Sequence, residues 1–214
     1  MGVLSDSFSV MLHAINMEIL KHPIFYNAPI GIRFEIGGDA GAYLNDSHKL
    51  NPAYVSAAFD RAKTIYANLP HSPDILRIDG YPDEEKSAQK VVLAVCKEAK
   101  LPPPDEQELL PFRWYEDDES ISQLQLYWDL KKIKFVPDVL LREIIKSDIG
   151  GGYSEFTSNV YFADTKNSIL FHLYDDRGAD LVGANKELIR PIFERFNNWI
   201  LDYDREKINT TFTK

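Results

Sequence analysis

Apolar and polar residues follow two patterns along this chain, one typical of helices and one typical of strands. Apolar side chains recur every three or four residues over 8–19, which predicts an amphipathic helix. Residues 31–36 (GIRFEI) instead alternate Ile or Phe with Arg or Glu, as in a strand with one buried face. By the same criteria we expect helices over 52–69, 87–100 and 139–149, and strands over 74–81 and 121–130.

The C-terminal part of the chain has the clearest pattern. Three apolar segments, 159–163, 169–174 and 179–182, are separated by the turn sequences DTKNS and DDRG and predict an antiparallel meander. Beyond Asn185, a favoured helix cap, apolar residues form one stripe of a long helix. The stripe consists of Leu188, Ile192, Phe196, Trp199 and Tyr203. Pro191 predicts either a kink in this helix or a helix that begins only at Arg190.

These patterns predict an α+β fold with a mostly antiparallel sheet, in which a C-terminal three-stranded meander is covered by a long C-terminal helix. The 214 residues, 44% hydrophobic and with twelve Phe and eleven Tyr, suit a single domain with a substantial core. Four prolines in LPPPDEQELLP interrupt regular structure. We therefore expect one α+β domain over 1–214, with an acidic, proline-rich loop or insertion at about 101–120.

The net charge limits which partners we expect, and the cysteine count limits which cellular compartment we expect. The net charge of −9 argues against nucleic acids and membranes as partners, because nucleic acids and anionic membranes are themselves polyanions. Cys96 is the only cysteine, which excludes an intramolecular disulfide and a cysteine-rich metal site. The start of the chain lacks the basic region and cleavage site of a signal peptide, and no apolar run is long enough to span a membrane. We expect a cytoplasmic protein.

A glycine-rich stretch and five histidines are the first candidates for chemistry. FEIGGDAGAYLN (34–45) follows a predicted strand, where a phosphate-binding loop would lie. Its spacing is GGxxG instead of GxGxxG, and no lysine follows in the Walker position, so we interpret it as a turn. The histidines show no metal-ligand spacing, and we therefore expect neither a metal nor a cofactor. They are His13, His22, His48, His71 and His172.

The sequence HLYDDRGADLVGANK (172–186) places two acids beside an arginine and a glycine. In the structural interpretation Asp175 to Gly178 connect two strands of a hairpin, with Gly178 in the left-handed conformation. In the alternative, Asp175 and Asp176 are metal-binding or acid–base carboxylates of a hydrolase-like enzyme, with His172 as helper. Adjacent strand residues point to opposite faces, so both acids in one site would require an irregular turn. We favour the hairpin turn and predict no catalytic residue.

An acidic segment with aromatic residues at its centre gives the sharper hypothesis. DEQELLPFRWYEDDES (105–120) carries seven acidic side chains and one arginine, a net charge of −6 out of the −9 of the whole chain. Aromatic side chains inside a charged rim are typical of a protein–protein hot spot, and clustered acids steer a basic partner. The alternative is a solvated loop whose aromatics pack in the core. The predicted partner-binding residues are Phe112, Trp114, Tyr115, Glu116, Asp117, Asp118 and Glu119.

Three sequence blocks resemble one bacterial family. They are FEIGG followed by AYLN, the helix AFDRAKTIYANL, and the C-terminal block LYDDRGADLVGANKELIRPIFERFNNWILDYDRE (173–206). Together they resemble the domain-of-unknown-function family DUF3885, whereas residues 84–119 show no such likeness. The resemblance brings no catalytic residue to this chain. Similar proteins occur in Gram-positive bacteria, some encoded near genes of polymorphic-toxin systems, so the resemblance implies an immunity protein.

Three classes of function remain for this chain. It could bind and neutralise a basic protein partner such as a toxin nuclease, form an enzyme site from scattered residues, or serve as a structural subunit through the stripe on its last helix. The acidic charge, the abundant aromatics and the lack of a catalytic motif favour the first class. We expect a cytoplasmic protein-binding protein instead of an enzyme, and the pattern leaves the oligomeric state open.

Overall fold

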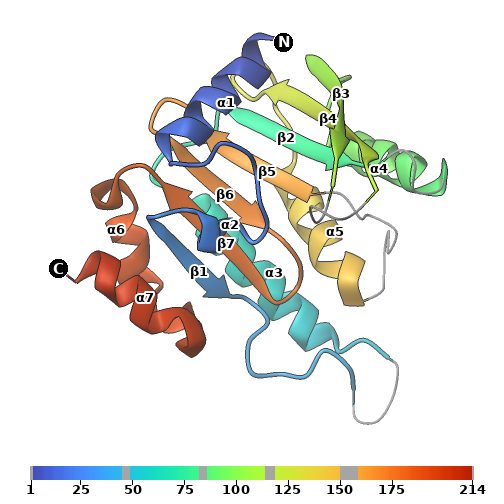
Figure 1. Ribbon diagram of the computed structural model, residues 1–214. Helices are drawn as coiled ribbons and strands as arrows, with labels where there is room; N and C mark the ends of the chain where they lie inside the picture. The colour runs from blue at the N-terminus through green and yellow to red at the C-terminus, as the bar shows by residue number, and fades with distance from the viewer. Residues whose placement is uncertain (1, 45–48, 82–85, 114–118, 150–158, 214) are drawn as a thin grey trace.

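The computed structural model describes residues 2–44, 49–81, 86–113, 119–149 and 159–213 (Figure 1). The strands are β1 (Gly31–Glu35), β2 (Ile75–Gly80), β3 (Glu106–Phe112), β4 (Ile121–Asp129), β5 (Asn159–Asp164), β6 (Ile169–Leu173) and β7 (Gly178–Gly183). The helices are α1 (Val3–Ala14), α2 (Ile24–Asn27), α3 (Pro52–Ala67), α4 (Lys86–Glu98), α5 (Pro137–Ile149), α6 (Lys186–Arg195), the 3-10 helix η1 (Asn197–Trp199) and α7 (Asp202–Phe212). Within these residues the seven strands form one sheet in the order β1-β7-β6-β5-β2-β4-β3.

The predicted fold class is confirmed. Every pair of neighbouring strands is antiparallel, and β5, β6 and β7 form the predicted C-terminal meander. The alternation in GIRFEI correctly predicted β1, and the helical spacing correctly predicted α3 and α5 to within two residues at each end. A helix also opens the chain as predicted, but α1 spans Val3–Ala14 and so begins and ends five residues before the predicted 8–19. The two-residue alternation and the helical spacing both reflect which face of an element is buried, and this is why they predicted these elements.

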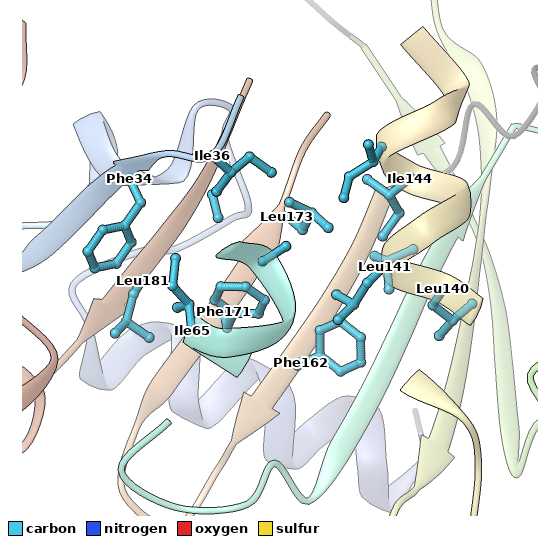
Figure 2. Packing of buried hydrophobic residues seen from close by; sticks show 14 of the residues in the cluster. Phe34, Ile36, Ile65, Leu140, Leu141, Ile144, Phe162, Phe171, Leu173 and Leu181 are labelled. Atoms are coloured by element: carbon cyan, nitrogen blue, oxygen red, sulfur yellow. The ribbon is translucent and has the colours of Figure 1, made fainter. Parts of the chain in front are cut away.

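One face of the sheet is apolar and carries the larger core. Helices α3, α4, α5 and α6 contribute buried residues to it, and Figure 2 shows side chains of α3 and α5 meeting those of the strands. Burying one side chain of the size of Phe171 stabilises the fold by about 1.5–3 kcal/mol. One row of laterally paired residues across this face, from β1 to β4, is apolar throughout: Ile32, Leu181, Phe171, Phe162, Leu76 and Trp128.

Helices α1 and α2 and the segment between them lie over the opposite face (Figure 1). Beneath them this face carries a row of polar and aromatic side chains. Arg33 pairs with Asp180 at 2.7 Å, and Arg77 pairs with Asp79 at 2.6 Å. Each guanidinium therefore has a carboxylate partner, which buried charges require. The laterally paired residues of this row are Arg33, Asp180, His172, Tyr161, Arg77, Tyr127 and Glu106, one from each strand.

The predicted single C-terminal helix is in fact two helices, α6 and α7. Pro191 lies inside α6, which begins at Lys186, so of the two alternatives the start at Arg190 is wrong. The break follows Phe196, because Ile200 has extended backbone and forms an antiparallel bridge with Phe34 of β1. Trp199 of η1 still packs on the core and stacks on Phe196, but Tyr203 in α7 is 84% exposed, so the predicted stripe does not continue into α7.

The predicted loop at about 101–120 contains a strand. Residues 106–112 form β3, which pairs with β4 from Glu106–Tyr127 to Phe112–Ile121. Pro111 lies in this strand without breaking it, as prolines do at the edge of a sheet. The strand escaped the pattern analysis because most of its side chains are exposed or half-exposed.

Candidate functional site

The DDRG turn connects β6 to β7 and is held by its own side chains. Asp175 Oδ1 accepts a hydrogen bond of 2.7 Å from the backbone N–H of Arg177, an arrangement that mimics a backbone turn. Asp175 Oδ2 accepts from Arg177 Nε at 2.8 Å. The two residues thus form an ion pair within the turn, and both oxygens of Asp175 have donors.

Asp176 is buried beside α3 and has a different environment. Its side chain is 3% exposed, and its Oδ2 accepts a hydrogen bond of 2.5 Å from the Tyr54 hydroxyl. Its Oδ1 is buried and has no hydrogen-bond partner among the residues that the structure describes. Burial raises the pKa of Asp176; the Tyr54 hydrogen bond opposes this shift, and the charge of Asp175 adds to it. Burial and the bond to Asp176 in turn raise the pKa of Tyr54.

Asp148, near the end of α5, brings a third carboxylate to the turn. Oxygen atoms of Asp148, Asp175 and Asp176 all lie within 4.8 Å of one another. Arg177 also reaches Asp148, with 3.6 Å between Nη2 and Oδ2. The irregular turn therefore does bring both acids of DDRG together, which a regular strand could not do. We call Asp148, Asp175 and Asp176 the carboxylate cluster.

Two glycines allow the loops around this cluster to approach closely. A Cβ atom at Gly37 would lie 2.6 Å from the Tyr54 hydroxyl, and one at Gly178 would lie 2.7 Å from the carbonyl oxygen of Phe34. The sequence interpretation of Gly178 as a left-handed residue is wrong, because Gly38 is the glycine with positive φ in the described chain. Gly178 lies in β7 and is required for space, not for its φ angle.

His172 does not join the carboxylate cluster. Its ring lies on the sheet face under α1 and α2, stacked on Tyr161 with 4.7 Å between centroids and 4.9 Å from the ring of His22. Asp176 bonds instead to α3, which packs on the opposite face. Both ring nitrogens of His172 are buried without a partner in the described residues. Burial lowers the pKa of His172 well below its ordinary value, and nearby His22 and Arg33 lower it further.

The predicted partner-binding residues lie at and beyond the end of β3. Phe112 is half-buried and packs on Tyr81, with 5.5 Å between ring centroids, and Glu119 is exposed. The other five predicted residues, Trp114, Tyr115, Glu116, Asp117 and Asp118, lie outside the described residues.

Two acids that the sequence analysis counted in the acidic segment have a structural role. Glu106 accepts hydrogen bonds from the backbone N–H groups of Leu4 and Ser5 in the first turn of α1, and Glu108 accepts one from the Ser5 hydroxyl. Their charge therefore stabilises the start of α1 instead of facing a partner.

Comparison with known proteins now adds to this geometry. The family described as "Domain of unknown function (DUF3885)" matches residues 9–204. The chain belongs to this family. Over 53 residues it is 36% identical to "Uncharacterized protein YnaE" of Bacillus subtilis (strain 168), a match that spans 25% of each chain. No solved structure matches the chain.

In this DUF3885 chain, the sequence blocks that resembled the family meet around the carboxylate cluster. Ile36 of FEIGG donates its backbone N–H to the Arg177 carbonyl oxygen at 2.9 Å. Tyr43 of AYLN donates to the Ile149 carbonyl oxygen at 3.1 Å, next to Asp148. Arg61 of the helix AFDRAKTIYANL reaches the carbonyl oxygen of Glu35 at 3.3 Å.

The sequence analysis missed Tyr54 and Asp148 as parts of this site. Tyr54 lies 122 residues before Asp176, and no local pattern links them. The contacts of Tyr54 on α3 and of Asp148 on α5 with the β6–β7 turn bring these DUF3885 residues together. Among the described residues, the helices are either too short or too polar to cross a membrane.

Proposed function

We propose that this DUF3885 protein binds a basic protein partner through β3 and the acidic segment that follows it. The observation that carries the proposal is the exposed edge of the sheet. β3 is the last strand in the order and pairs with β4 on one side. Two of its leucines, Leu109 and Leu110, are 62% and 42% exposed.

An edge strand is a surface to which another chain can add. Its outward N–H and C=O groups offer backbone hydrogen bonds, and exposed apolar side chains add contact area. The other edge strand, β1, is bridged by Ile200 through Phe34 and is therefore covered. Among the described residues, no strand or isolated bridge pairs with the outer side of β3, and two of its leucines are exposed.

Charge supports a basic partner over an acidic or neutral one. Three acids of the segment are already used within the chain: Glu106 and Glu108 accept hydrogen bonds from α1, and Asp105 accepts one from the backbone N–H of Asp129. The charge for a partner must therefore come from the acids that follow them. The acids from Glu116 to Glu119 begin four positions after the last residue of β3 and add four negative charges. A cluster of one sign raises the association rate of an oppositely charged partner and suppresses wrong partners.

The aromatic residues Phe112, Trp114 and Tyr115 supply the contact side chains in this proposal. Aromatic anchors dominate the binding energy of many interfaces, whereas charges at the rim set the association rate. Because the family resemblance implies an immunity protein, we propose a basic toxin domain as the partner that this chain neutralises.

A reducing cytoplasm suits this proposal. Cys96 is buried in the core, and burial raises the pKa of its thiol to about 11, so the thiol is not a reactive group. We propose that the protein acts in the cytoplasm, because its single cysteine forms no disulfide and an immunity protein would meet its toxin there.

The test is affinity purification of the tagged protein from its own cells at low salt, followed by mass spectrometry. We expect a basic protein to co-purify in a fixed ratio and to elute as the salt concentration rises. Leu109→Ser with Leu110→Ser removes the apolar contacts, and amides in place of the four acids from Glu116 to Glu119 remove the charge. Both variants should lose the partner while keeping the melting temperature of the wild type.

Matched controls keep this test specific. Ile19→Ser removes an apolar side chain that is 61% exposed elsewhere on the surface, and should retain the partner. Asp202→Asn removes an acid of α7 whose side chain is 97% exposed, and should also retain it. Equal capture of the partner by the wild type, by the leucine variant and by the amide variant would refute the proposed surface.

A further inference from the structure

We propose that the carboxylate cluster is a binding site for a hard divalent cation such as Ca²⁺ or Mg²⁺. The site is formed by Asp148 from α5 and by Asp175 and Asp176 from the β6–β7 turn. This inference does not depend on the proposed function, because β3 and the acidic segment contribute no residue to it.

The geometry of the three acids fits such an ion. Their oxygens lie within 4.8 Å of one another, and ligands on opposite sides of a Ca²⁺ ion are about 4.6–5.2 Å apart. Oxygen-only ligands favour Ca²⁺ or Mg²⁺ over softer transition metals. Three carboxylates leave several positions in the coordination sphere for water, as is usual for these ions.

An independent observation points to a ligand at this place. Asp176 Oδ1 is buried without a hydrogen-bond donor among the described residues, while Oδ2 is bound to Tyr54. A buried carboxylate oxygen that lacks a partner is costly, so it calls for a proton, a water molecule or a cation. The negative charges of Asp148 and Asp175 nearby make a cation the more effective neutralising group.

Arg177 shows that the cluster already attracts positive charge. Its guanidinium contacts Asp175 and lies 3.6 Å from Asp148, but within the described chain it donates no hydrogen bond to Asp176 Oδ1. The Arg177 side chain is 70% exposed, so it can turn toward solvent when an ion binds. A cation bridging Asp148 and Asp176 would fix the end of α5 to the β6–β7 turn.

The experiment is a titration of the full chain, first stripped with EDTA, with CaCl₂ and separately with MgCl₂. Calorimetry and the melting temperature are read in parallel. We expect one ion to bind in a single site with a dissociation constant below about 1 mM and to raise the melting temperature. Terbium(III) luminescence excited through tyrosine is a third readout, because Tyr54 lies beside Asp176.

The variants separate cation binding from structure. Asp148→Asn changes a residue whose side chain is 53% exposed, so the fold should persist while affinity falls about tenfold or more. Asp176→Asn should abolish binding. Asp138→Asn is the matched control, because Asp138 lies on α5 like Asp148 but pairs with Lys63 of α3, and it should bind as the wild type does.

Replacement of Arg177, whose positive charge competes with the ion, should change the affinity in the opposite direction. Arg177→Gln removes the positive charge beside the cluster, so affinity for the ion should rise. No heat and no shift with either salt up to about 1 mM would overturn the proposal. Equal binding by Asp148→Asn and the wild type would overturn it too, because the ion would lie elsewhere.

Discussion

Gly178 lies where β7 approaches β1 too closely for any side chain. A methyl group at this position would overlap the Tyr174 hydroxyl and would lie 2.7 Å from the carbonyl oxygen of Phe34. This close approach joins the DDRG turn to β1 and explains why the turn contains a glycine at this place. A side chain there would push β1 and β7 apart, and backbone atoms cannot move aside as a flexible side chain can.

We predict that Gly178→Ala lowers the free energy of unfolding by about 3 kcal/mol, because the added methyl group overlaps both neighbours. Gly41→Ala is the matched control: the nearest atom to its Cβ would be 3.6 Å away, so its effect should stay within about 0.5 kcal/mol. Urea denaturation measures both. Equal stability of the two variants would show that β1 and β7 can separate without cost.

His172 gives a prediction for pH dependence. The groups that face it are His22, Arg33, Tyr161 and Tyr174, with Asp180 beside it in the row. Its pKa is lowered in the folded state, so the unfolded chain binds a proton more readily below about pH 6.5. Stability from this residue is therefore complete above about pH 6.5 and is lost as the pH falls.

We expect the wild type to lose about 1.4 kcal/mol more than His172→Phe between pH 7.5 and pH 5.5. Phenylalanine keeps the stack on Tyr161 but does not titrate. The free energy of unfolding in urea at the two pH values is the measurement. An identical loss in both proteins would mean that His172 is not the group that takes up the proton.

The residues of the carboxylate cluster show how far sequence reasoning reached. Asp175 and Asp176 stood out because two acids beside Gly178 form a visible motif. Tyr54 and Asp148 carry no local signal, because a tyrosine in a first helical turn and an acid near a helix end are common and usually solvated. His172 seemed to belong with the acids by its distance in sequence, but strand alternation places it on the other face.

At the scale of elements, the spacing of apolar residues predicted the helices and strands whose buried positions follow a regular pattern. β1 and α3 carry apolar residues at the regular spacing of a strand and of a helix, and the meander strands are buried on both faces, so their patterns are complete in the sequence. The break between α6 and α7 depends on Ile200 pairing with Phe34, a contact that no local pattern contains. β3 was missed because an exposed edge strand has no buried face with a strong alternation.

The contact between β3 and α1 gives a prediction at this scale. Glu106 of β3 accepts the N–H groups of Leu4 and Ser5, which the helix itself cannot satisfy. Glu106→Gln should cost about 1 kcal/mol of stability and increase amide exchange in the first turn of α1. Glu206→Gln on α7 serves as control and should leave exchange in α1 unchanged. No change in α1 for Glu106→Gln would show that the cap contributes nothing.

At the scale of the whole molecule, charge and exposure are unevenly distributed. One face of the sheet is sealed by α3 to α6, and the other by α1 and α2. The edge at β1 is bridged, whereas β3 presents two exposed leucines beside the most acidic segment of the chain. The proposed partner surface thus lies at the edge of the sheet that the described helices and strands leave accessible.

The most direct test of this account is hydrogen exchange of the protein alone and in complex with its captured partner. We predict that amides of β3, between Glu106 and Phe112, gain protection on binding, while amides of β1 are unchanged. Protection confined to the β6–β7 turn, with β3 exchanging as in the free protein, would contradict the proposed surface.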